Sequence, residues 1–363
     1  MKFKFTIIIL FLSSLCMGQK NNFLESLRIP INSRLDFRYL DYKNDTDNLS
    51  NDLRFQFSYF KIDVFGNIYD NLNFRLRYSP VTSSIGTSGI SNEMQLANIN
   101  YVSKNKRWYF ELGKSFLNLG TNEEQYNGAD VFSWSIIALN IETYLTGVSA
   151  EYRFRNGQNV GFQIMNGNKN IDNVVQSLEY NIYWFGKIGD LVNTYFSATA
   201  IMGSNESSTP FTFNGGLQWK INDYRLDTDA AVMYNFTNFY TNTLYYSFPI
   251  QLKKVVGKWS PYVKYVYNIV NPINDIPIEF NGDVINLEEA HLHTITGGIQ
   301  YYPLEDKNFR FHLVSSYSFD NDLVKYAPTV IDPGNTRIGY NASFQVILGV
   351  RVNFDILNGL QSR

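Results

Sequence analysis

The chain has 363 residues and a formal net charge of −2, a balance that argues against a general nucleic-acid-binding protein. Aromatic residues make up 16% of the chain, with 26 Tyr and 28 Phe, yet the mean hydropathy is negative, at -0.22. Because a soluble β-sandwich or β-helix would gather these rings in continuous core runs, their alternation with polar residues favours a membrane β-barrel.

The first 18 residues have the pattern of a secretory signal peptide. Lys2 and Lys4 form its basic region, and residues 6–12 form an apolar core too short for a transmembrane helix. Acylation of Cys16 is the alternative, but Leu15 stands where a lipobox has a small residue. Removal of 1–18 leaves one domain over 19–363, with a charge of (31 − 2) − 33 = −4 and no cysteine for a disulfide or thiol site.

Short segments with alternating apolar and polar residues follow one another from residue 34 onwards. In the first, Leu35 and Phe37 alternate with Arg34, Asp36 and Arg38, which is typical of a strand between lipid and water. The second changes phase near residue 59, which predicts a β-bulge there. Strands are predicted over 34–42, 53–65, 72–78, 94–102, the two flanks of a long insert at 116–146, 160–165, 178–186, 192–202, 211–221, 224–236, 244–252, 259–268, 291–302, 309–319 and 340–354.

These segments predict an all-β fold: a transmembrane, antiparallel, up-and-down β-barrel of about 16 strands, whose lumen would be filled with water. Long and short connections alternate along the chain. Since outer-membrane barrels have short periplasmic turns and longer outer loops, both termini are predicted to be periplasmic. The last strand alternates up to Phe354, an aromatic residue suited to the closing strand of such a barrel.

The insert at 116–146 is too long for an ordinary connection. It carries the acids Glu123, Glu124 and Asp130, together with apolar residues that need a place to be buried: Phe132, Trp134, Ile136, Ile137 and Leu139. Both needs are met if this third outer loop folds into the lumen, with its apolar side on the inner wall and its acids toward the water.

Three short motifs resemble the porin O/P-type outer-membrane porins, in particular those of Bacteroidota. They are ELGKSFLNLGTNEE at 111–124, YLTGVSAEYRF at 144–154 and FQIMNGN at 162–168. The resemblance implies a channel for small solutes, a homotrimer, and a third loop that narrows the pore. Phosphate selectivity in this family depends on a ladder of lumen arginines and lysines, and no complete ladder is found here.

Inward-facing charges are predicted to form two arcs, a basic one on the last two and first three strands and an acidic one in the middle of the chain. A transverse field between them would sort small polar solutes. The predicted residues at the pore lining or constriction are Arg38, Arg75, Arg77, Glu111, Glu123, Glu124, Asp130 and Glu151. The alternative is that these charges are simply paired, for example Arg75 and Arg77 with Asp36 and Asp63.

The histidines give weaker signals. His291 and His293 share one strand face near Glu288 and Glu289, but the strand phase turns that face toward lipid, so a rim position is favoured over a metal site. His312 shares an inward face with Arg310 and Ser316, and no third partner for a hydrolase is evident. No catalytic residue, cofactor or metal is predicted.

The sequence therefore predicts a porin in the outer membrane of a Gram-negative cell, in contact with outer-membrane lipid and passively conducting small hydrophilic solutes or ions. Anion preference is one option, and the solute is left open. The alternatives are a substrate-specific exporter or transporter, for polysaccharide or hydrophobic solutes, and a membrane-embedded hydrolase barrel. A fatty-acid-type transporter would need an N-terminal plug, and a first strand that starts by about Leu35 leaves room for only a short segment. The hydrolase lacks an evident catalytic cluster.

Overall fold

The computed structural model describes residues 22–42, 50–80, 93–167, 177–202, 209–234, 243–273, 277–280, 283–286, 289–320 and 343–357. The predicted signal peptide and the outer loop at 321–342 lie outside these ranges. None of the helices in the described part is long and apolar enough to cross a membrane.

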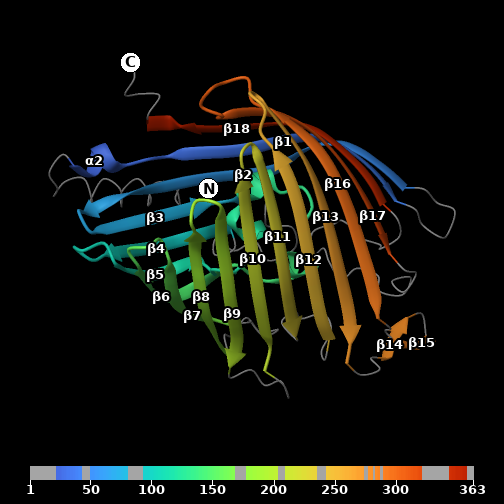
Figure 1. The fold of residues 1–363 in the computed structure, drawn as a ribbon, viewed down its shortest axis with the longest axis horizontal. Coiled ribbons are helices and arrows are strands. Elements are labelled where there is room, and N and C mark those ends of the chain that lie inside the picture. The colour runs from blue at the N-terminus through green and yellow to red at the C-terminus, as the bar shows by residue number, and fades with distance from the viewer. Residues whose placement is uncertain are drawn as a thin grey trace, which may run out of the picture.

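Sixteen strands form one closed antiparallel barrel, as predicted (Figure 1). Neighbours in sequence are neighbours in the sheet, and β1 pairs with β18 to close it. The strands are β1 Pro30–Tyr42, β2 Ser50–Tyr69, β3 Leu72–Tyr78, β4 Met94–Val102, β5 Trp108–Phe116, β6 Tyr144–Arg153, β7 Asn159–Asn166, β8 Leu178–Ile188, β9 Val192–Met202, β10 Phe211–Ile221, β11 Tyr224–Tyr234, β12 Thr243–Lys254, β13 Trp259–Pro272, β16 Ala290–Tyr301, β17 Phe309–Asp320 and β18 Ser343–Asp355.

Outside the long insert, a short helix and a small hairpin were not predicted. A one-turn helix, α2 (Asn22–Ser26), precedes β1, and its Phe23 stacks on Phe74 of β3 at a ring-centroid distance of 6.0 Å. A hairpin of β14 (Pro277–Phe280) and β15 (Asp283–Asn286) lies in the loop between β13 and β16, outside the barrel sheet. Figure 1 shows α2 and the end of β18 at one end of the barrel, and this hairpin at the other.

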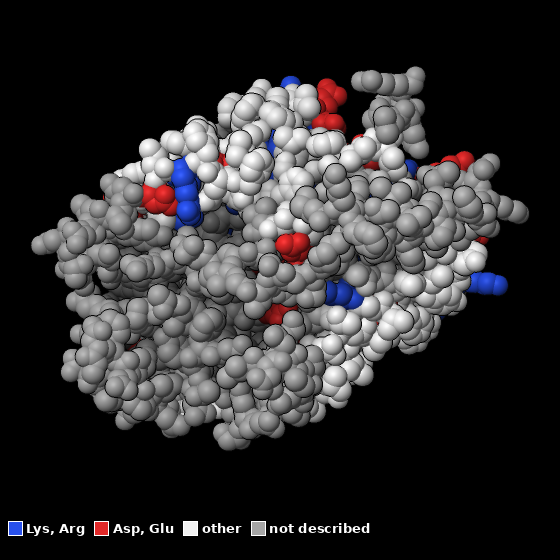
Figure 2. Space-filling model, turned by 180° about the vertical axis from the view of Figure 1, so that it is seen from behind, with Lys and Arg blue, Asp and Glu red and all other residues white. Residues whose placement is uncertain are grey.

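Alternation places apolar side chains outside and polar ones inside. Phe55, Leu112 and Phe213 are more than half exposed on the outer face, whereas Asn181, Thr212 and Ser247 are fully buried on the inner face. On the face in Figure 2, charged side chains of the described residues are few and stand apart. This is the surface expected for a barrel that is surrounded by lipid.

Four tryptophans form a girdle near the short turns. Trp108 and Trp259 begin β5 and β13, while Trp184 and Trp219 lie near the ends of β8 and β10, and all four are 37–48% exposed. Tryptophan favours the interface between membrane and water. The girdle therefore marks one membrane boundary, at the end where α2 and the short turns lie.

The predicted bulge in β2 is present. The register between β1 and β2 shifts between Arg34 and Leu35, which pair with Tyr59 and Phe57. Ser58 is thereby left out of the ladder, and Tyr59 turns into the lumen, whereas the sequence pattern had placed it on the lipid face. The extra residue reverses the side-chain alternation beyond it, which brings Lys61 and Asp63 inside.

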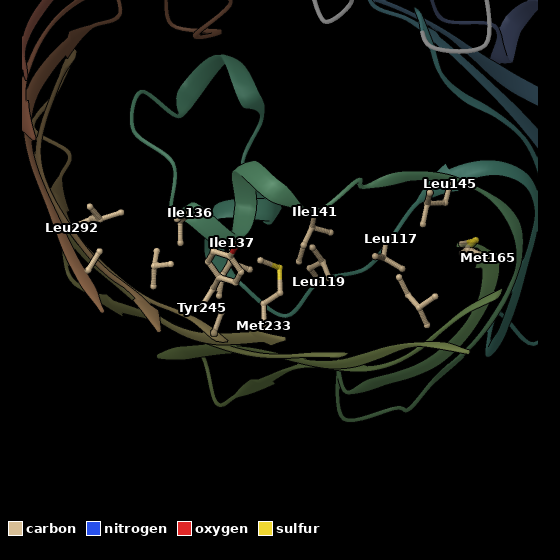
Figure 3. Packing of buried hydrophobic residues seen from close by; sticks show 14 residues of the cluster. Leu117, Leu119, Ile136, Ile137, Ile141, Leu145, Met165, Met233, Tyr245 and Leu292 are labelled. Carbon is tan, nitrogen blue, oxygen red and sulfur yellow. The ribbon is translucent and has the colours of Figure 1, made fainter. Parts of the chain in front are cut away.

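The third outer loop, residues 117–143 and hereafter L3, folds into the barrel as predicted (Figure 3). It leaves the wall at Gly113 and Gly147, which pair directly, and Gly113 adopts a φ of 125° that favours glycine. The β4–β5 ladder ends at Lys114, but β5 and β6 stay paired to Phe116 and Tyr144. The end of this hairpin is thus free to bend inward.

The apolar side of L3 packs on the inner wall. Its contribution to the core is Leu117, Leu119, Ile136, Ile137 and Ile141, which meet wall residues such as Met165, Met233, Tyr245 and Leu292 (Figure 3). The prediction that Leu139 is buried is wrong, because it is 47% exposed. It lies two residues from Ile137 in α5 (Ile136–Asn140), about 200° around the helix, and so points away from the wall.

Candidate functional site: the lumen and its loop

L3 is fixed to the inner wall through hydrogen bonds from its main chain. The amide of Asn118 donates to Gln163 Oε1 at 2.8 Å, that of Gly120 to Ser197 Oγ at 2.8 Å, and that of Asn122 to Asp229 Oδ1 at 2.7 Å. A side chain at Gly120 would overlap the backbone of β9, so only glycine permits this approach. The first part of the loop therefore follows the wall from β7 to β11.

Glu123 holds the middle of L3 to β13. It lies at the start of the one-turn helix α4 (Asn122–Gln125), is 3% exposed, and pairs with Lys264. The amide of Ser135 donates to Glu123 at 3.1 Å, and Lys264 also donates to the carbonyl of Ser133 at 2.6 Å. Glu123 was predicted to face the lumen, but the structure places it in a closed contact between loop and wall.

Three arginines of the predicted basic arc hold the far end of L3. Arg310 and Arg351 both pair with Asp130, and Arg34 donates to the carbonyl of Ala129 at 3.0 Å. Ala129 and Asp130 belong to a 3-10 helix at Gly128–Asp130. Asp130 is thus neutralised by two arginines of β17 and β18, instead of facing Arg38, Arg75 and Arg77 as expected.

A buried network behind this contact was missed by sequence reasoning. His312 Nε2 lies 2.9 Å from Asp36 Oδ1, and Asp36 also pairs with Arg34 at 2.9 Å. The two partners come from β17 and β1, with Gly349 of β18 between them, where a Cβ would overlap both. The sequence did contain a signal for this pair. Asp36 and His312 both have the inward phase of their strands, and closure of the barrel brings β1 and β17 to either side of β18.

The wall formed by β2 and β3 carries two more arginines, which share one aspartate. Arg75 and Arg77 both donate to Asp63 Oδ1, at 3.1 Å and 2.8 Å. Their side chains are 40% and 18% exposed, so one aspartate offsets two cations that still reach the lumen. The alternative of simple pairing therefore holds for Asp63, whereas Asp36 pairs with Arg34 and His312.

Lys61 extends this basic cluster toward L3. Its Nζ donates to Tyr144 Oη at 3.2 Å and lies 4.7 Å from the ring centre of Tyr59. Tyr144 begins β6, where the hairpin has bent away from the wall, so this contact spans the lumen between β2 and the base of L3. Lys61 was not among the predicted site residues, although the predicted bulge already implied that its side chain points inward.

The acids of β5 and β6 lie on the adjoining wall. Glu111 accepts from Tyr109 Oη at 3.1 Å, and Glu151 accepts from Arg153 Nε at 2.6 Å and from Tyr183 Oη at 3.0 Å. The structure thus brings Arg75, Arg77, Glu111 and Glu151 onto neighbouring strands from β2 to β6. Arg38 of β1 is a half-buried residue with an interaction of its own.

Glu124 and Tyr126 lie at the C-terminal end of α4, hereafter the edge of L3. Burial, followed by the neighbouring charge of Glu123, raises the pKa of the Glu124 carboxyl to about 8, while Lys61 acts in the opposite direction. The Tyr126 hydroxyl donates to Asp227, and Arg225 lies 4.7 Å from the centre of its ring. Burial, followed by the charge of Asp227, raises the pKa of Tyr126.

The histidines of β16 lie on the outer face. Tyr265 Oη lies 2.7 Å from His293 Nδ1, and Tyr267 Oη lies 2.6 Å from His291 Nδ1. The predicted rim position fits these contacts. In the part of the chain that the structure describes, no group of three or more His, Cys, Asp or Glu residues could hold a metal ion.

Comparisons with known proteins agree with this architecture. Residues 28–186 match the family model described as phosphate-selective porin O and P. A comparison with curated proteins finds no match. The family match covers the region in which the resemblance was predicted, from β1 to β8, and it supports that resemblance.

Solved structures share the fold across nearly the whole chain. The outer membrane channel DcaP of Acinetobacter baumannii is 11% identical, with a TM-score of 0.60, over 90% of this chain and 96% of its own. An anion-selective porin from Comamonas acidovorans is 12% identical, with a TM-score of 0.57, over 91% and 99%. The trimer form of OmpT, an outer membrane protein of Vibrio cholerae, is 12% identical, with a TM-score of 0.55, over 91% and 100%.

Proposed function

We propose that this chain, whose residues 28–186 match the family model of phosphate-selective porins O and P, is an outer-membrane channel that passively conducts small hydrophilic solutes or ions. The observation that carries the proposal is a sixteen-stranded barrel with a polar inner wall, narrowed by a loop that is bonded to one side of that wall. A water-filled lumen is the expected interior of a barrel of this size.

The path for solutes lies, in this proposal, along the wall from β2 to β6 and past the edge of L3. Arg38, Arg75 and Arg77 supply its cations, while Glu111, Glu124 and Glu151 supply its acids. Glu123 and Asp130 act as anchors of the constriction. Because the arginines of β3 outnumber their single partner Asp63, we expect a modest preference for anions.

The test is single-channel conductance of the purified protein in planar bilayers, with reversal potentials measured in a salt gradient. The proposal predicts stable, ohmic conductance steps and a reversal potential on the anion side. A correctly folded barrel that conducts no ions would contradict the channel function itself.

Hydrolase activity is the second function to consider, because the structure contains the Asp36–His312 pair. Both side chains have 0% exposure and lie behind Arg34 and Phe132, whose ring is 5.0 Å from the imidazole of His312. A pair that no substrate reaches fits a structural role at the barrel seam. The chain is therefore proposed to act without catalysis.

Orientation and assembly complete the proposal. The start of β1 and the end of β18 share one barrel end with the short turns and the tryptophan girdle, and this end, with both termini, is proposed to be periplasmic. A tag in 303–308 should then be protected on intact cells and a tag in 320–339 accessible. A homotrimer is proposed by analogy with the trimer form of the Vibrio cholerae protein, and native mass measurement in detergent would test it.

A further inference from the structure

A row of aromatic rings follows the inner wall below L3. It consists of Tyr109 on β5, Tyr183 and Phe185 on β8, Tyr195 on β9 and Tyr126 on L3. The four wall residues have the inward phase of their strands, since Trp184 and Phe196 between them are exposed on the outer face. Inward rings are unusual where alternation otherwise places polar side chains inside.

Three of the five rings, those of Tyr183, Phe185 and Tyr195, are adjacent to one another. The centroids of Tyr183 and Phe185 are 4.9 Å apart, and those of Phe185 and Tyr195, which pair directly across β8 and β9, are 5.5 Å apart. Tyr183 lies across Gly161 of β7, where a Cβ would overlap its ring. The row therefore continues over β7, toward Glu151 on β6.

Hydroxyl groups at both ends of the row are held by acids. Tyr183 donates to Glu151 at 3.0 Å, Tyr109 donates to Glu111 at 3.1 Å, and Tyr126 donates to Asp227. These bonds fix the rings by their edges. Tyr109, Phe185, Tyr195 and Tyr126 are only partly buried, so their surfaces remain available to the lumen.

Polar side chains that can both donate and accept hydrogen bonds lie beside the rings. Asn193 donates to Gln218 at 2.8 Å, and Gln218 donates to Tyr126 Oη at 3.4 Å. The charged neighbours are Arg153 and Arg225 against Glu111, Glu151 and Asp227, a net charge of 2 − 3 = −1. Glu151 is paired with Arg153 and Asp227 with Arg225. The charged groups that could bind an ionic solute are therefore already paired with each other.

We propose that this row is a binding track for neutral carbohydrate. A sugar ring has an apolar face of C–H groups, which fits an aromatic surface, and a rim of hydroxyl groups, which can exchange hydrogen bonds with amide and paired charged side chains. Weak, repeated sites of this kind favour entry without preventing release. The inference rests on the proposed channel function and names a solute class for it.

The experiment measures block of the single-channel ion current by maltotriose and by cellotriose. We expect each sugar to reduce the current in a saturable manner. Phe185→Ala and Tyr195→Ala should each raise the half-blocking concentration several-fold to about tenfold, because one aromatic contact contributes on that scale. Tyr302→Ala is the matched control, since this tyrosine bonds to Gln300 on β16, away from the row, and should leave the block unchanged.

Phe185→Leu provides a second variant that keeps an apolar side chain but removes the flat ring. It should weaken the block as well, which a loss of folding would not explain. The proposal is overturned if neither sugar reduces the current, if the control variant weakens the block equally, or if indole blocks the current where the sugars do not. Since ion current without sugar reports the channel itself, these failures differ from a failure of the channel function.

Discussion

The two halves of the inner wall carry similar residues but use them differently. On β1, β13, β17 and β18, Arg34, Lys264 and Arg310 are 8% exposed or less and bond to L3. On β3, the side chains of Arg75 and Arg77 are 40% and 18% exposed and keep access to the lumen, beside the half-buried Glu111 of β5. Inward charge alone therefore does not identify a pore lining, because the loop decides which charges meet solute.

The variant with the largest expected effect on conductance is one that lacks most of the loop. Deletion of 123–139, bridged by a short Gly-Ser linker, should raise single-channel conductance several-fold, because it frees the half of the lumen that L3 occupies. Heat-modifiable migration on gels would verify that the barrel is assembled. An assembled deletion variant with unchanged conductance would show that the constriction lies elsewhere.

A narrower test removes one contact that anchors L3 to the wall, the pair of Glu123 and Lys264. Lys264→Met leaves the buried Glu123 carboxylate without its cation, which should cost about 3–5 kcal/mol of stability. Addition of Glu123→Gln should recover much of this loss, since the uncompensated charge is then removed. Thermal unfolding in detergent measures both variants, and equal losses in the single and the double variant would refute the anchor role.

The open half is tested through its charge. Arg75→Glu combined with Arg77→Glu should move the reversal potential toward cations, because four units of charge change near Asp63. The matched control is Arg310→Gln, which removes one positive charge from the half of the wall bonded to L3. The reversal potential should shift less per unit of charge in the control than in the double variant. Equal shifts per unit of charge would contradict the distinction between the two halves of the wall.

The smallest expected effect is a pH step at the edge of L3. The Glu124 carboxyl, with a pKa of about 8, is protonated below that pH and ionised above it, so cation preference should increase as the pH rises through about 8. Because this pKa lies above the ordinary value, the stability of the packed loop should decline as the pH rises between the two values. Glu124→Gln should abolish the step in reversal-potential titrations, and persistence of the step would assign it to another group.

The barrel could be predicted because the alternation of apolar and polar residues is visible within the sequence of each single strand. Leu35 and Phe37 facing lipid, or Arg34 and Asp36 facing the lumen, follow from a period of two residues without knowledge of their neighbours. The long L3 was also identifiable, since apolar residues such as Ile136 and Ile137 had no place on its exposed surface. These inferences need only local sequence and one physical rule.

The partners of the charges could not be predicted in the same way. The pairs Glu123–Lys264 and Asp130–Arg310 join residues far apart in sequence, and their register depends on where the loop turns. The predicted bulge in β2 implied an inward Lys61, but its partner Tyr144 lies on the far side of L3 in sequence and could not be identified. Asp36 and His312 meet only through barrel closure across Gly349. Each case depends on tertiary contacts that local alternation does not encode.

The central claim, that solute passes along the wall opposite the anchored side of L3, is tested most directly by cysteine accessibility. The only cysteine of the chain is Cys16, in the predicted signal peptide, so single cysteines can be placed one at a time. With a cationic thiol reagent, Arg75→Cys and Glu111→Cys should react and change the ion current, whereas Thr296→Cys and Gln300→Cys on β16 should not. Rapid reaction at the β16 positions with none at residues 75 and 111 would contradict the account.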